Sequence, residues 1–306
     1  MKKNINILVT GATGFIGSHL CKELIKKNYT VFGLALNKSA SIKSLLSEKN
    51  FYFEKCDIQN INRINQIIKK NNIKIIFHLA AALPNQKEFK NPFIPSDINA
   101  GGTLNLLYSA SINKVQKFIY SSTSSVYSEP PEYLPVDENH PTFPSTIYGA
   151  SKLSGELYCK VYSKIMNVVV LRYCGAYGVG QDEHYATHRF VKQALNQEPI
   201  TIYGAGNQTT DFTYVDDIVK GSILAIKRIK EGTYNISSGQ ETSIKKLAET
   251  IIKLTNSKSK IIFSGKKTDR PFRFVLDIKK AKKVLGYSSL SLEKGLSKYI
   301  SEFKSV

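Results

Sequence analysis

The first twenty residues, Met1–Leu20, read MKKNINILVTGATGFIGSHL. A β-branched run over Ile5–Thr10 predicts a strand, and three glycines and a helical pattern follow it. Gly11 allows a tight turn, Gly14 lets backbone approach a pyrophosphate because it has no Cβ, and Gly17 lets the helix pack close to the sheet. The first N–H groups of that helix favour a phosphate. The GxxGxxG spacing departs from GxGxxG by one residue, but the strand before it and the helix after it predict a dinucleotide-binding turn.

The composition is that of a globular protein, with 306 residues, 42% hydrophobic and 22% charged. This length suits one large α/β unit or two closely joined domains. We expect no membrane span, since no apolar run is long enough, and Ile5–Val9 is too short for a signal-peptide core. The four cysteines are scattered without a CxxC pair, and the five histidines show no ligand spacing. We therefore expect reduced thiols, a cytoplasmic location and no metal.

The net charge of +19 is unusual, with 43 Lys and Arg against 24 Asp and Glu. Such a balance can attract nucleic acid, an anionic membrane or a phosphorylated substrate. The lysines are dispersed, however, and their pairs fall near the ends or polar faces of helical segments. We therefore expect solvated charge, and neither a nucleic-acid nor a membrane partner.

The first half of the chain alternates strand-like and helix-like segments, which indicates a parallel sheet with helices on both faces. The predicted fold class is α/β, a doubly wound parallel sheet (Rossmann) with a smaller α+β substrate-binding domain. Right-handed crossovers place the carboxyl ends of the strands along one edge, where the cofactor is expected. Strands are expected over Ile5–Thr10, Thr30–Leu36, Phe51–Cys56, Ile75–Leu79, Lys117–Ser121 and Val168–Leu171.

Two domains are predicted, a dinucleotide-binding domain over 1–172 and a substrate-binding domain over 173–306. From Tyr173 onward the alternation breaks into glycine-rich loops, shorter strands and two late helices near Ile244–Leu254 and Ile278–Leu285. The segment DFTYVDDIV again predicts a strand and then a helix. We therefore expect residues 208–236 to return to the main sheet, which makes the second domain discontinuous.

Tyr148 and Lys152 are four residues apart in STIYGASKLSGELY, a spacing that puts both side chains on one helical face. A free tyrosine has a pKa of about 10 and is a poor base at neutral pH. An adjacent ammonium stabilises the phenolate, and so would the positive charge of an oxidised nicotinamide ring, so Tyr148 is expected to take a hydroxyl proton as hydride leaves the same carbon. Thr123, at the end of the fifth strand, can hold the reacting oxygen toward Tyr148.

The chain resembles the extended short-chain dehydrogenase/reductases, the superfamily of UDP-galactose 4-epimerase and related nucleotide-sugar enzymes. The resemblance covers essentially the whole length. The motifs that carry it are VTGATGFIG at 9–17, HLAA at 78–81, NAGGT at 99–103, YSSTSSVY at 120–127, YGASK at 148–152, LRYCGAYGVG at 171–180, YGAGNQTTDFTYVDDIV at 203–219, NISSGQETSIKKLA at 235–248, DRPFRFVLD at 269–277 and LGY at 285–287.

The resemblance implies roles for individual residues. Thr123, Tyr148 and Lys152 match the family's catalytic Ser/Thr, Tyr and Lys, and Lys152 also holds the nicotinamide ribose. Arg270 matches an arginine that binds the diphosphate of the sugar nucleotide. The resemblance also implies a homodimer, formed through helices of the catalytic face. The residues that match the family's cofactor contacts are Gly11, Gly14, Phe15, Ile16, Gly17, Asp57, Ile58, Leu79, Ala80, Ala81, Asn99, Tyr173 and Cys174.

The end of the second strand leaves the choice between NAD and NADP open. NAD-preferring members usually carry an acidic residue there, which hydrogen-bonds both ribose hydroxyls. Here Ala35 takes that position, and Asn37 and Lys38 follow it. Lys38 can attract a 2′-phosphate, so both residues are candidate cofactor contacts.

The substrate side departs from the family pattern in two ways. Gly175 and Thr210 replace the usual asparagine and arginine, which leaves Arg189, Arg270 and Arg273 as candidates for the diphosphate. Ser124 and Ser125 stand where dehydratases and decarboxylases of the family carry a carboxylate. Elimination and decarboxylation are therefore disfavoured.

The predicted function is NAD(P)-dependent hydride chemistry on a nucleotide-linked sugar, with C4 epimerisation of a UDP-hexose first. An NADPH-dependent 4-ketoreductase of a 4-keto-6-deoxy sugar nucleotide is the second hypothesis, favoured by Ala35 and Lys38. A third, from another class, is a non-catalytic cofactor-binding fold that binds RNA or a partner protein.

Overall fold

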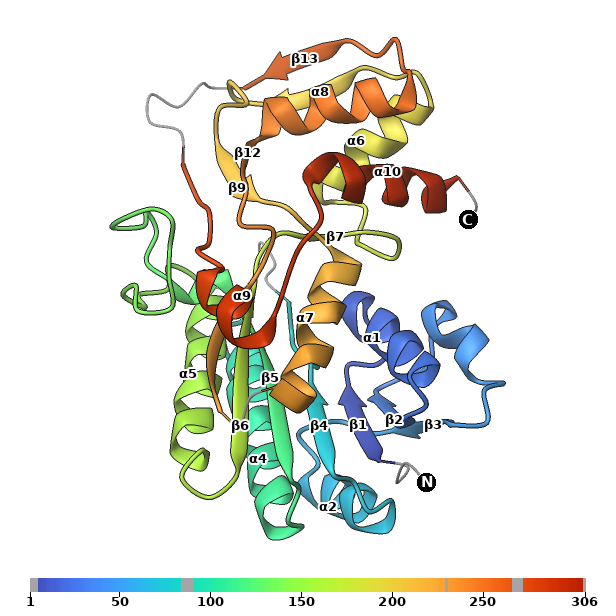
Figure 1. The fold of residues 1–306 in the computed structure, drawn as a ribbon, viewed down its shortest axis with the longest axis vertical. Helices are drawn as coiled ribbons and strands as arrows, with labels where there is room; N and C mark the ends of the chain where they lie inside the picture. Colours follow the sequence, from blue (N-terminus) through green and yellow to red (C-terminus); the bar gives the residue numbers. More distant parts are fainter. Residues whose placement is uncertain (1–4, 84–90, 229–230, 266–271, 305–306) are drawn as a thin grey trace.

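A computed structural model describes residues 5–83, 91–228, 231–265 and 272–304. Its centre is a seven-stranded sheet in the order β11-β6-β5-β4-β1-β2-β3, in which every neighbouring pair is parallel (Figure 1). The predicted fold class, a doubly wound parallel sheet, is confirmed. The strands of this sheet are β1 (Asn6–Thr10), β2 (Thr30–Ala35), β3 (Phe51–Lys55), β4 (Ile75–His78), β5 (Lys117–Thr123), β6 (Asn167–Tyr173) and β11 (Gly232–Ile236).

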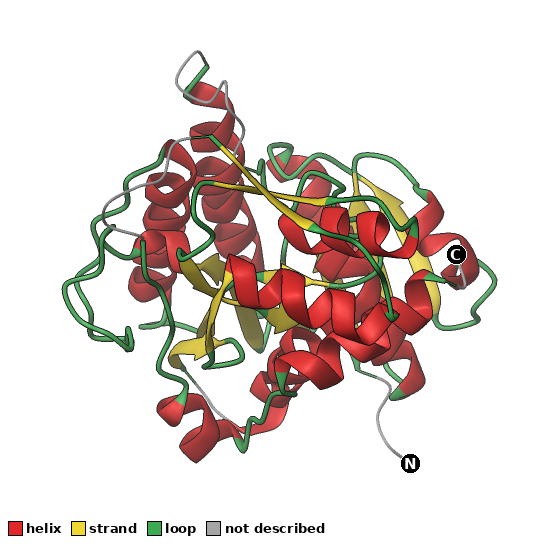
Figure 2. Cartoon of the chain, turned by 90° about the horizontal axis from the view of Figure 1, so that it is seen from above, coloured by secondary structure: helices red, strands yellow, loops and turns green. Residues whose placement is uncertain are grey.

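Helices cover both faces of the sheet, as the view from above shows (Figure 2). On one face the core includes Leu20 from α1 and Ile218 from α7. On the other face it includes Ile67 from α2, Leu106 from α4 and Cys159 from α5. The helices of this body are α1 (Phe15–Lys26), α2 (Ile61–Lys70), α3 (Phe93–Pro95), α4 (Gly102–Ile112), α5 (Ile147–Tyr162), α7 (Val215–Arg228) and α9 (Lys279–Leu285), with the shorter turns η1 (Ala40–Leu45), η2 (Ser96–Gly101) and η3 (Ser124–Val126).

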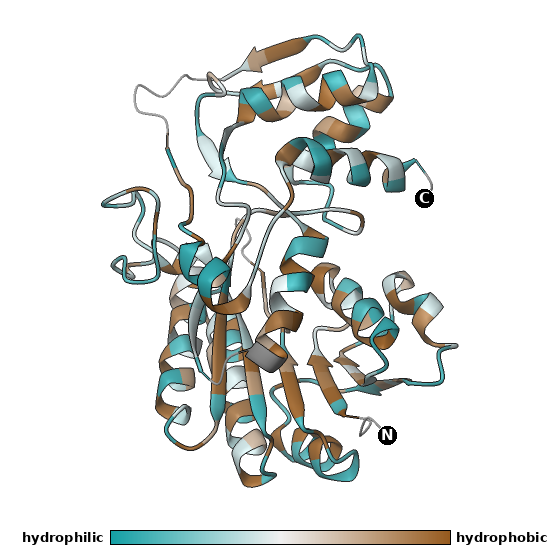
Figure 3. Ribbon diagram, viewed as in Figure 1, coloured by the Kyte–Doolittle hydropathy of each residue, from teal (hydrophilic) through white to brown (hydrophobic). Residues whose placement is uncertain are grey.

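The central strands read as continuous apolar runs because both of their faces are covered. All four residues of β4 are buried, and so are the last four of β1. The strands are accordingly among the most hydrophobic parts of the ribbon (Figure 3). The edge strand β3 is different, since Glu54 and Lys55 end it and Phe51 is its one buried residue.

Two strands extend further than the sequence pattern indicates. β5 and β6 pair over seven positions, from Lys117 opposite Asn167 to Thr123 opposite Tyr173. The polar side chains near their ends hide this continuation, because the predicted bounds follow the apolar runs. Thr123 therefore lies in the strand, and the backbone pairing fixes its direction.

The segment after residue 208 contributes β10 (Thr213–Tyr214), α7 and β11. β11 pairs in parallel with β6, from Gly232 opposite Val169 to Ile236 opposite Tyr173. Helix α7 packs against α1, and Ile218 and Val219 lie in the core of the sheet. This part of the chain thus completes the sheet after the chain has entered the upper lobe of Figure 1.

The upper lobe is built around three helices that share one core, which includes Phe190, Leu247 and Leu296. Only two late helices were predicted, so α10 is an addition; Ser291 begins it by accepting a hydrogen bond from the N–H of Lys294. The predicted helix near Ile278–Leu285 is α9, which packs on α7 and β11 rather than in this lobe. The helices of this lobe are α6 (Ala186–Leu195), α8 (Ile244–Thr255) and α10 (Leu292–Phe303), and the strands outside the main sheet are β7 (Ala176–Tyr177), which pairs with β10, β8 (Ile200–Tyr203), β9 (Thr209–Asp211), β12 (Glu241–Ser243) and β13 (Ile261–Ser264).

Candidate active site

The glycine turn lies at the carboxyl end of β1, and each glycine has a different geometric reason to be there. Gly11 has φ +70°, and a Cβ on it would lie 2.8 Å from the backbone nitrogen of Ala80. A Cβ on Gly17 would lie 2.1 Å from the carbonyl oxygen of Gly11, so Gly17 lets the helix start against the turn itself. A Cβ on Gly14 would meet only that carbonyl oxygen, at 3.2 Å. The outer side of Gly14 is therefore open to a ligand.

Helix α1 starts directly at this turn, with Gly14 as the N-cap and no side-chain cap. Phe15 packs against the core of the upper lobe, and Ile16 packs against both that core and the core of the sheet, so their contribution at the turn is backbone N–H. One turn later, His19 donates from Nε2 to the carbonyl oxygen of Val179 at 2.9 Å. The N-terminal turn of the helix is thus held between the two lobes.

The loop after β2 is tied to the same turn. The hydroxyls of Ser39 and Ser41 both donate to the carbonyl oxygen of Thr13, at 3.2 and 2.8 Å. Asn37 and Lys38, the predicted ribose contacts, are exposed, and the Lys38 ammonium lies 5.8 Å from the centroid of the Phe53 ring. The two serines were not predicted; only their position just beyond the second strand could have indicated them.

Asp57 and Ile58, two of the predicted cofactor contacts, differ from each other in exposure. The exposed Asp57 accepts a hydrogen bond from the N–H of Gln59 at 2.9 Å. Ile58 is buried and packs so closely on α4 that a Cβ on Gly102 would lie 2.5 Å from its Cδ1. Its side chain therefore contributes to the core of the α4 side.

Residues 79–81, which follow β4 and form the strand-end wall, are hydrogen-bonded to β1. The backbone N–H of Leu79 donates to the carbonyl oxygen of Thr10 at 3.2 Å, and that of Ala80 donates to the Thr10 hydroxyl at 3.1 Å. Leu79, Ala80 and Ala81 are each partly exposed. They line the sheet edge beside Gly11.

Asn99 was predicted to contact the cofactor, but its side chain is 1% exposed and bound to protein atoms. Its amide nitrogen donates to the carbonyl oxygen of Ala82 at 3.0 Å and to the hydroxyl of Ser151 at 2.9 Å. Its amide oxygen accepts from the N–H of Ala82 at 2.7 Å. Since both amide hydrogens are in use, Asn99 ties the strand-end wall to helix α5.

His78 extends this network. Its two ring nitrogens lie 2.8 Å from the Thr10 hydroxyl and 2.9 Å from the Thr103 hydroxyl. Burial, and then the charge of Lys152, hold the pKa of His78 well below its usual value. A neutral histidine thus connects β1 to α4. A polar residue at the end of an otherwise apolar strand was the available signal.

The predicted catalytic residues come together at this edge. Thr123 ends β5 and shares a side-chain hydrogen bond with Tyr148, in the first turn of α5. A Cβ on Gly149 would lie 2.3 Å from the carbonyl oxygen of Ser125, so this glycine lets the helix approach the strand end. Lys152 lies one turn further along α5 and is 2% exposed.

The electrostatics differ from the sequence expectation. Burial raises the pKa of Tyr148 to about 12, with the hydrogen bond from Thr123 acting in the lowering direction. Burial also lowers the pKa of Lys152 to about 7. Desolvation thus acts against the phenolate and against the ammonium alike, and the stabilisation of the phenolate by the charge of Lys152 stays a prediction.

Tyr173 ends β6 and Cys174 follows it, and the two side chains face different surroundings. The Tyr173 hydroxyl lies 2.7 Å from the Ser222 hydroxyl of α7, inside the sheet core, so its side chain faces away from Tyr148. Cys174 is buried, and its thiol shares hydrogen bonds with the side chains of Ser124 and Thr210. Of the two predicted contacts, only Cys174 has its side chain beside the catalytic strand end.

The candidate arginines for the diphosphate differ in whether their guanidinium groups already have a partner in the protein. Arg189 lies on α6 with its guanidinium 5.4 Å from the Tyr203 ring centroid, and its Nε is buried without a hydrogen-bond partner. Arg273 is paired with Glu241 through two hydrogen bonds of 2.6 and 2.7 Å. Arg270 lies outside the described residues. Of the two candidates that the structure describes, Arg189 is thus the one with a buried donor still to satisfy.

A buried ion pair joins α5 to β6 and was not predicted from the sequence. Nη2 of Arg172 lies 2.7 Å from Oε2 of Glu156, and both side chains are less than a tenth exposed. Nε of Arg172 and the hydroxyl of Ser122 both donate to Oε1 of Glu156, at 3.0 and 2.5 Å. The available signals in the sequence were a carboxylate, Glu156, one turn after Lys152 and a cationic residue, Arg172, in the otherwise apolar run of β6.

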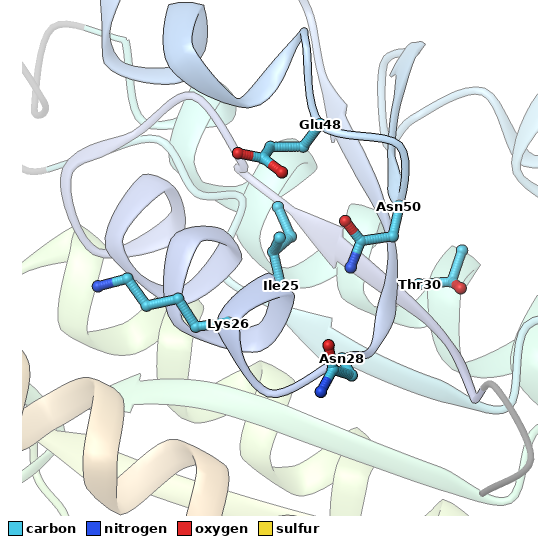
Figure 4. A pocket seen from close by; sticks show the side chains of 6 residues that line it. All are labelled: Ile25, Lys26, Asn28, Thr30, Glu48 and Asn50. Atoms are coloured by element: carbon cyan, nitrogen blue, oxygen red, sulfur yellow. The ribbon is translucent and has the colours of Figure 1, made fainter. Parts of the chain in front are cut away.

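A cavity of about 480 Å³ lies elsewhere, at the amino end of β2 (Figure 4). None of the predicted site residues lines it. Because parallel sheets bind ligands at the carboxyl ends of their strands, the site remains at the opposite edge. The lining residues are Ile25, Lys26, Asn28, Thr30, Glu48 and Asn50.

Residues 7–237 match the model of the NAD-dependent epimerase/dehydratase family. An uncharacterised UDP-glucose epimerase of Bacillus subtilis is 37% identical over 317 residues, covering 99% of each chain. The structure of UDP-glucose 4-epimerase from Thermotoga maritima with UDP-glucose superposes with a TM-score of 0.89 at 30% identity, over 98% of this chain and 99% of that one. The structure of UDP-glucuronic acid 4-epimerase from Bacillus cereus with UDP-glucuronic acid and NAD does so with 0.87 at 34% identity, over 98% and 99%.

The chain therefore belongs to the NAD-dependent epimerase/dehydratase family, and the predicted resemblance is confirmed. As a member of that family it is an NAD-dependent enzyme. Among the helices of the described residues, none is both long and apolar enough to cross a membrane.

Proposed function

We propose that this protein is an NAD-dependent epimerase that inverts C4 of a UDP-linked hexose. The observation that carries the proposal is the hydrogen-bonded Thr123 and Tyr148 with buried Lys152 one turn away. The similar structures from T. maritima and B. cereus, a UDP-glucose and a UDP-glucuronic acid 4-epimerase, support this reaction. Ser124 and Ser125 support it too, because no carboxylate stands there to serve elimination or decarboxylation.

The residues at the sheet edge fit NAD. Gly14 leaves room for a pyrophosphate, and the start of α1 presents backbone N–H groups to it. We assign to Lys152 the nicotinamide ribose, and to Ala80 and Ala81, which follow β4 at the same sheet edge, the wall along the cofactor. Bound NAD supplies the acceptor, and then the donor, of the hydride at the sugar carbon.

The chain's own residues manage the proton. The Thr123 hydroxyl holds the C4 oxygen, and Tyr148 takes its proton and returns it after the sugar has turned. A phenol with a pKa of about 12 ionises at pH 7 at a cost of ~7 kcal/mol. Positive charge beside the phenol must offset this cost, so the charged form of Lys152 is the active one.

The substrate contacts are also a proposal. The unpartnered Nε of Arg189 supports a hydrogen bond to an anionic or carbonyl oxygen of the sugar nucleotide. Arg270 stays a candidate for the diphosphate from its motif alone. For the alternative, an NADPH-dependent 4-ketoreductase, the specific observation is that β2 ends at Ala35 with exposed Lys38 close behind.

The test offers the purified protein UDP-glucose, UDP-galactose, UDP-glucuronate and UDP-galacturonate, and separates the products by chromatography. We expect interconversion of one C4 pair without net change in absorbance at 340 nm, and its loss in Tyr148→Phe. Mass spectrometry of the denatured protein identifies the retained dinucleotide. Consumption of NADPH with a 4-keto sugar nucleotide, together with no interconversion, would replace the epimerase by the reductase.

We also propose a homodimer formed through α4 and α5, which pack against each other. Leu104, Tyr108 and Ile112 are spaced by four residues on α4, and each is 37–53% exposed. Leu157, Val161 and Ile165 repeat this spacing at α5 and beyond its end, and are 57–71% exposed. Two apolar stripes side by side favour packing against a second copy. Light scattering should give twice the chain mass, and Val161→Glu should give a monomer.

The state of the cysteines bears on where the protein is located in the cell. The four cysteines are unpaired and buried, which fits the reducing cytoplasm that we propose as its location.

A further inference from the structure

The ammonium of Lys152 lies over the face of the Tyr120 ring. Its Nζ is 4.3 Å from the ring centroid. Tyr120 is 0% exposed and Lys152 is 2% exposed, so little water surrounds the pair. A cation over an aromatic face is attracted by the ring quadrupole, and the attraction is strongest where water is excluded. Tyr120 thus offers Lys152 a partner in surroundings that otherwise disfavour its charge.

The carboxylate nearest along the helix has another partner. Glu156 lies one turn after Lys152, but Arg172 pairs with it at 2.7 Å and Ser122 donates to it as well. Its negative charge is therefore balanced mainly by the guanidinium. The attraction that it still exerts on Lys152 works in the same direction as that of the ring.

Tyr120 is fixed in this place from three sides. It extends from β5 with its ring centroid 5.6 Å from that of His78, and its hydroxyl donates to the carbonyl oxygen of Lys152 at 3.2 Å. A Cβ on Gly155 would lie 2.3 Å from the Tyr120 hydroxyl oxygen. The glycine three residues after Lys152 therefore makes room for the ring.

We propose that Tyr120 is a positioning residue whose ring face holds the Lys152 side chain in its charged form beside Tyr148. The use of that charge, to favour the Tyr148 phenolate, rests on the proposed function. The contact between ring and ammonium does not depend on it.

The titratable and charged groups around Lys152 come from four elements. His78 of β4 is neutral, since burial holds its pKa well below the usual value, and Tyr120 of β5 stays protonated because burial raises its pKa. From α5, Cys159 is neutral because burial raises its pKa, Tyr148 is protonated at neutral pH, and Glu156 is paired with Arg172 of β6. Replacing Tyr120 thus removes a ring face and no charge.

The test measures the pKa of Lys152 directly, by NMR titration of protein labelled at the lysine ε-carbon. Lys152→Met assigns the signal by its absence. Tyr120→Leu keeps an apolar side chain but removes the ring, and we expect it to lower the pKa of Lys152 by about one unit, a tenfold change in the charged fraction at a given pH. Tyr120→Phe keeps the ring and should lower the pKa by less than about a third of that.

A second series guards against misfolding of the leucine variant. Phenylalanine with one, two or three ring fluorines at position 120 keeps the shape of the ring and weakens its quadrupole stepwise. The pKa of Lys152 should fall with each added fluorine. The pH above which turnover of the UDP-sugar declines should fall by the same amount. An unchanged pKa across the fluorinated series overturns the proposal. Should the wild-type protein turn over no UDP-sugar, the proposed function fails while the titration still decides the role of Tyr120.

Discussion

Arg172→Met would leave the Glu156 carboxylate buried without its cation. The pair is joined at 2.7 Å and is less than a tenth exposed on either side, and Ser122 supplies the one other side-chain hydrogen bond to that carboxylate among the described residues. Removing one partner of such a pair costs about 3–5 kcal/mol, because the remaining charge stays desolvated. A protein of marginal stability, with about 5–15 kcal/mol in total, loses a large share of its free energy of unfolding.

The assay is urea unfolding at pH 7, followed by circular dichroism at one fixed protein concentration. Arg172→Met should lower the free energy of unfolding by about 3–5 kcal/mol, and the double variant Arg172→Met with Glu156→Met should recover more than about half of that loss. The matched surface control is Arg63→Met, since Arg63 is 46% exposed and lies 3.1 Å from Glu54. It should cost less than about 1 kcal/mol. Equal losses for the buried and the surface arginine, or no recovery in the double variant, would refute the reasoning.

Three other outcomes are expected. Gly17→Ala should abolish NAD binding measured by calorimetry, because its Cβ would lie 2.1 Å from the carbonyl oxygen of Gly11. The control Gly101→Ala should bind NAD normally, since a Cβ at that position would have no atom within 4 Å. Equal NAD binding by the two variants would contradict the role given to the turn. Lys152 should contribute a rise of up to about 5 kcal/mol to the free energy of unfolding between about pH 7 and 10.5, since the unfolded chain binds its proton more tightly. The wild type minus Lys152→Met difference in the free energy of unfolding should show this rise, and parallel pH curves for the two proteins count against it. Asp211→Asn should lower the free energy of unfolding by about 2–3 kcal/mol, because the buried carboxylate of Asp211 accepts hydrogen bonds from the backbone N–H groups of Ser238, Gly239 and Leu276. The control Asp216→Asn, at a half-exposed position, should cost less than about 0.5 kcal/mol. Similar melting temperatures for the two variants would exclude the hydrogen-bond argument.

The sequence alone determined the features that depend on neighbours along the chain. The turn at Gly11, Gly14 and Gly17 is local, and so are the one-turn spacing of Tyr148 and Lys152 and the apolar strand runs. Each requires only a preferred backbone conformation or a repeat of hydrophobic residues. The parallel order of the strands then follows from right-handed crossovers, which places Thr123 at the same edge as the glycine turn.

The tertiary structure decided what each polar group faces. Asn99 binds Ala82 and Ser151, Arg273 binds Glu241, and Tyr173 reaches Ser222, over separations along the chain that no local pattern encodes. The direction of a pKa shift depends on how much water is excluded and on which charges lie near, and both arise only when distant segments pack. For this reason spacing along α5 could predict that Tyr148 and Lys152 lie together, but only the packed structure could show that burial opposes the charge of both.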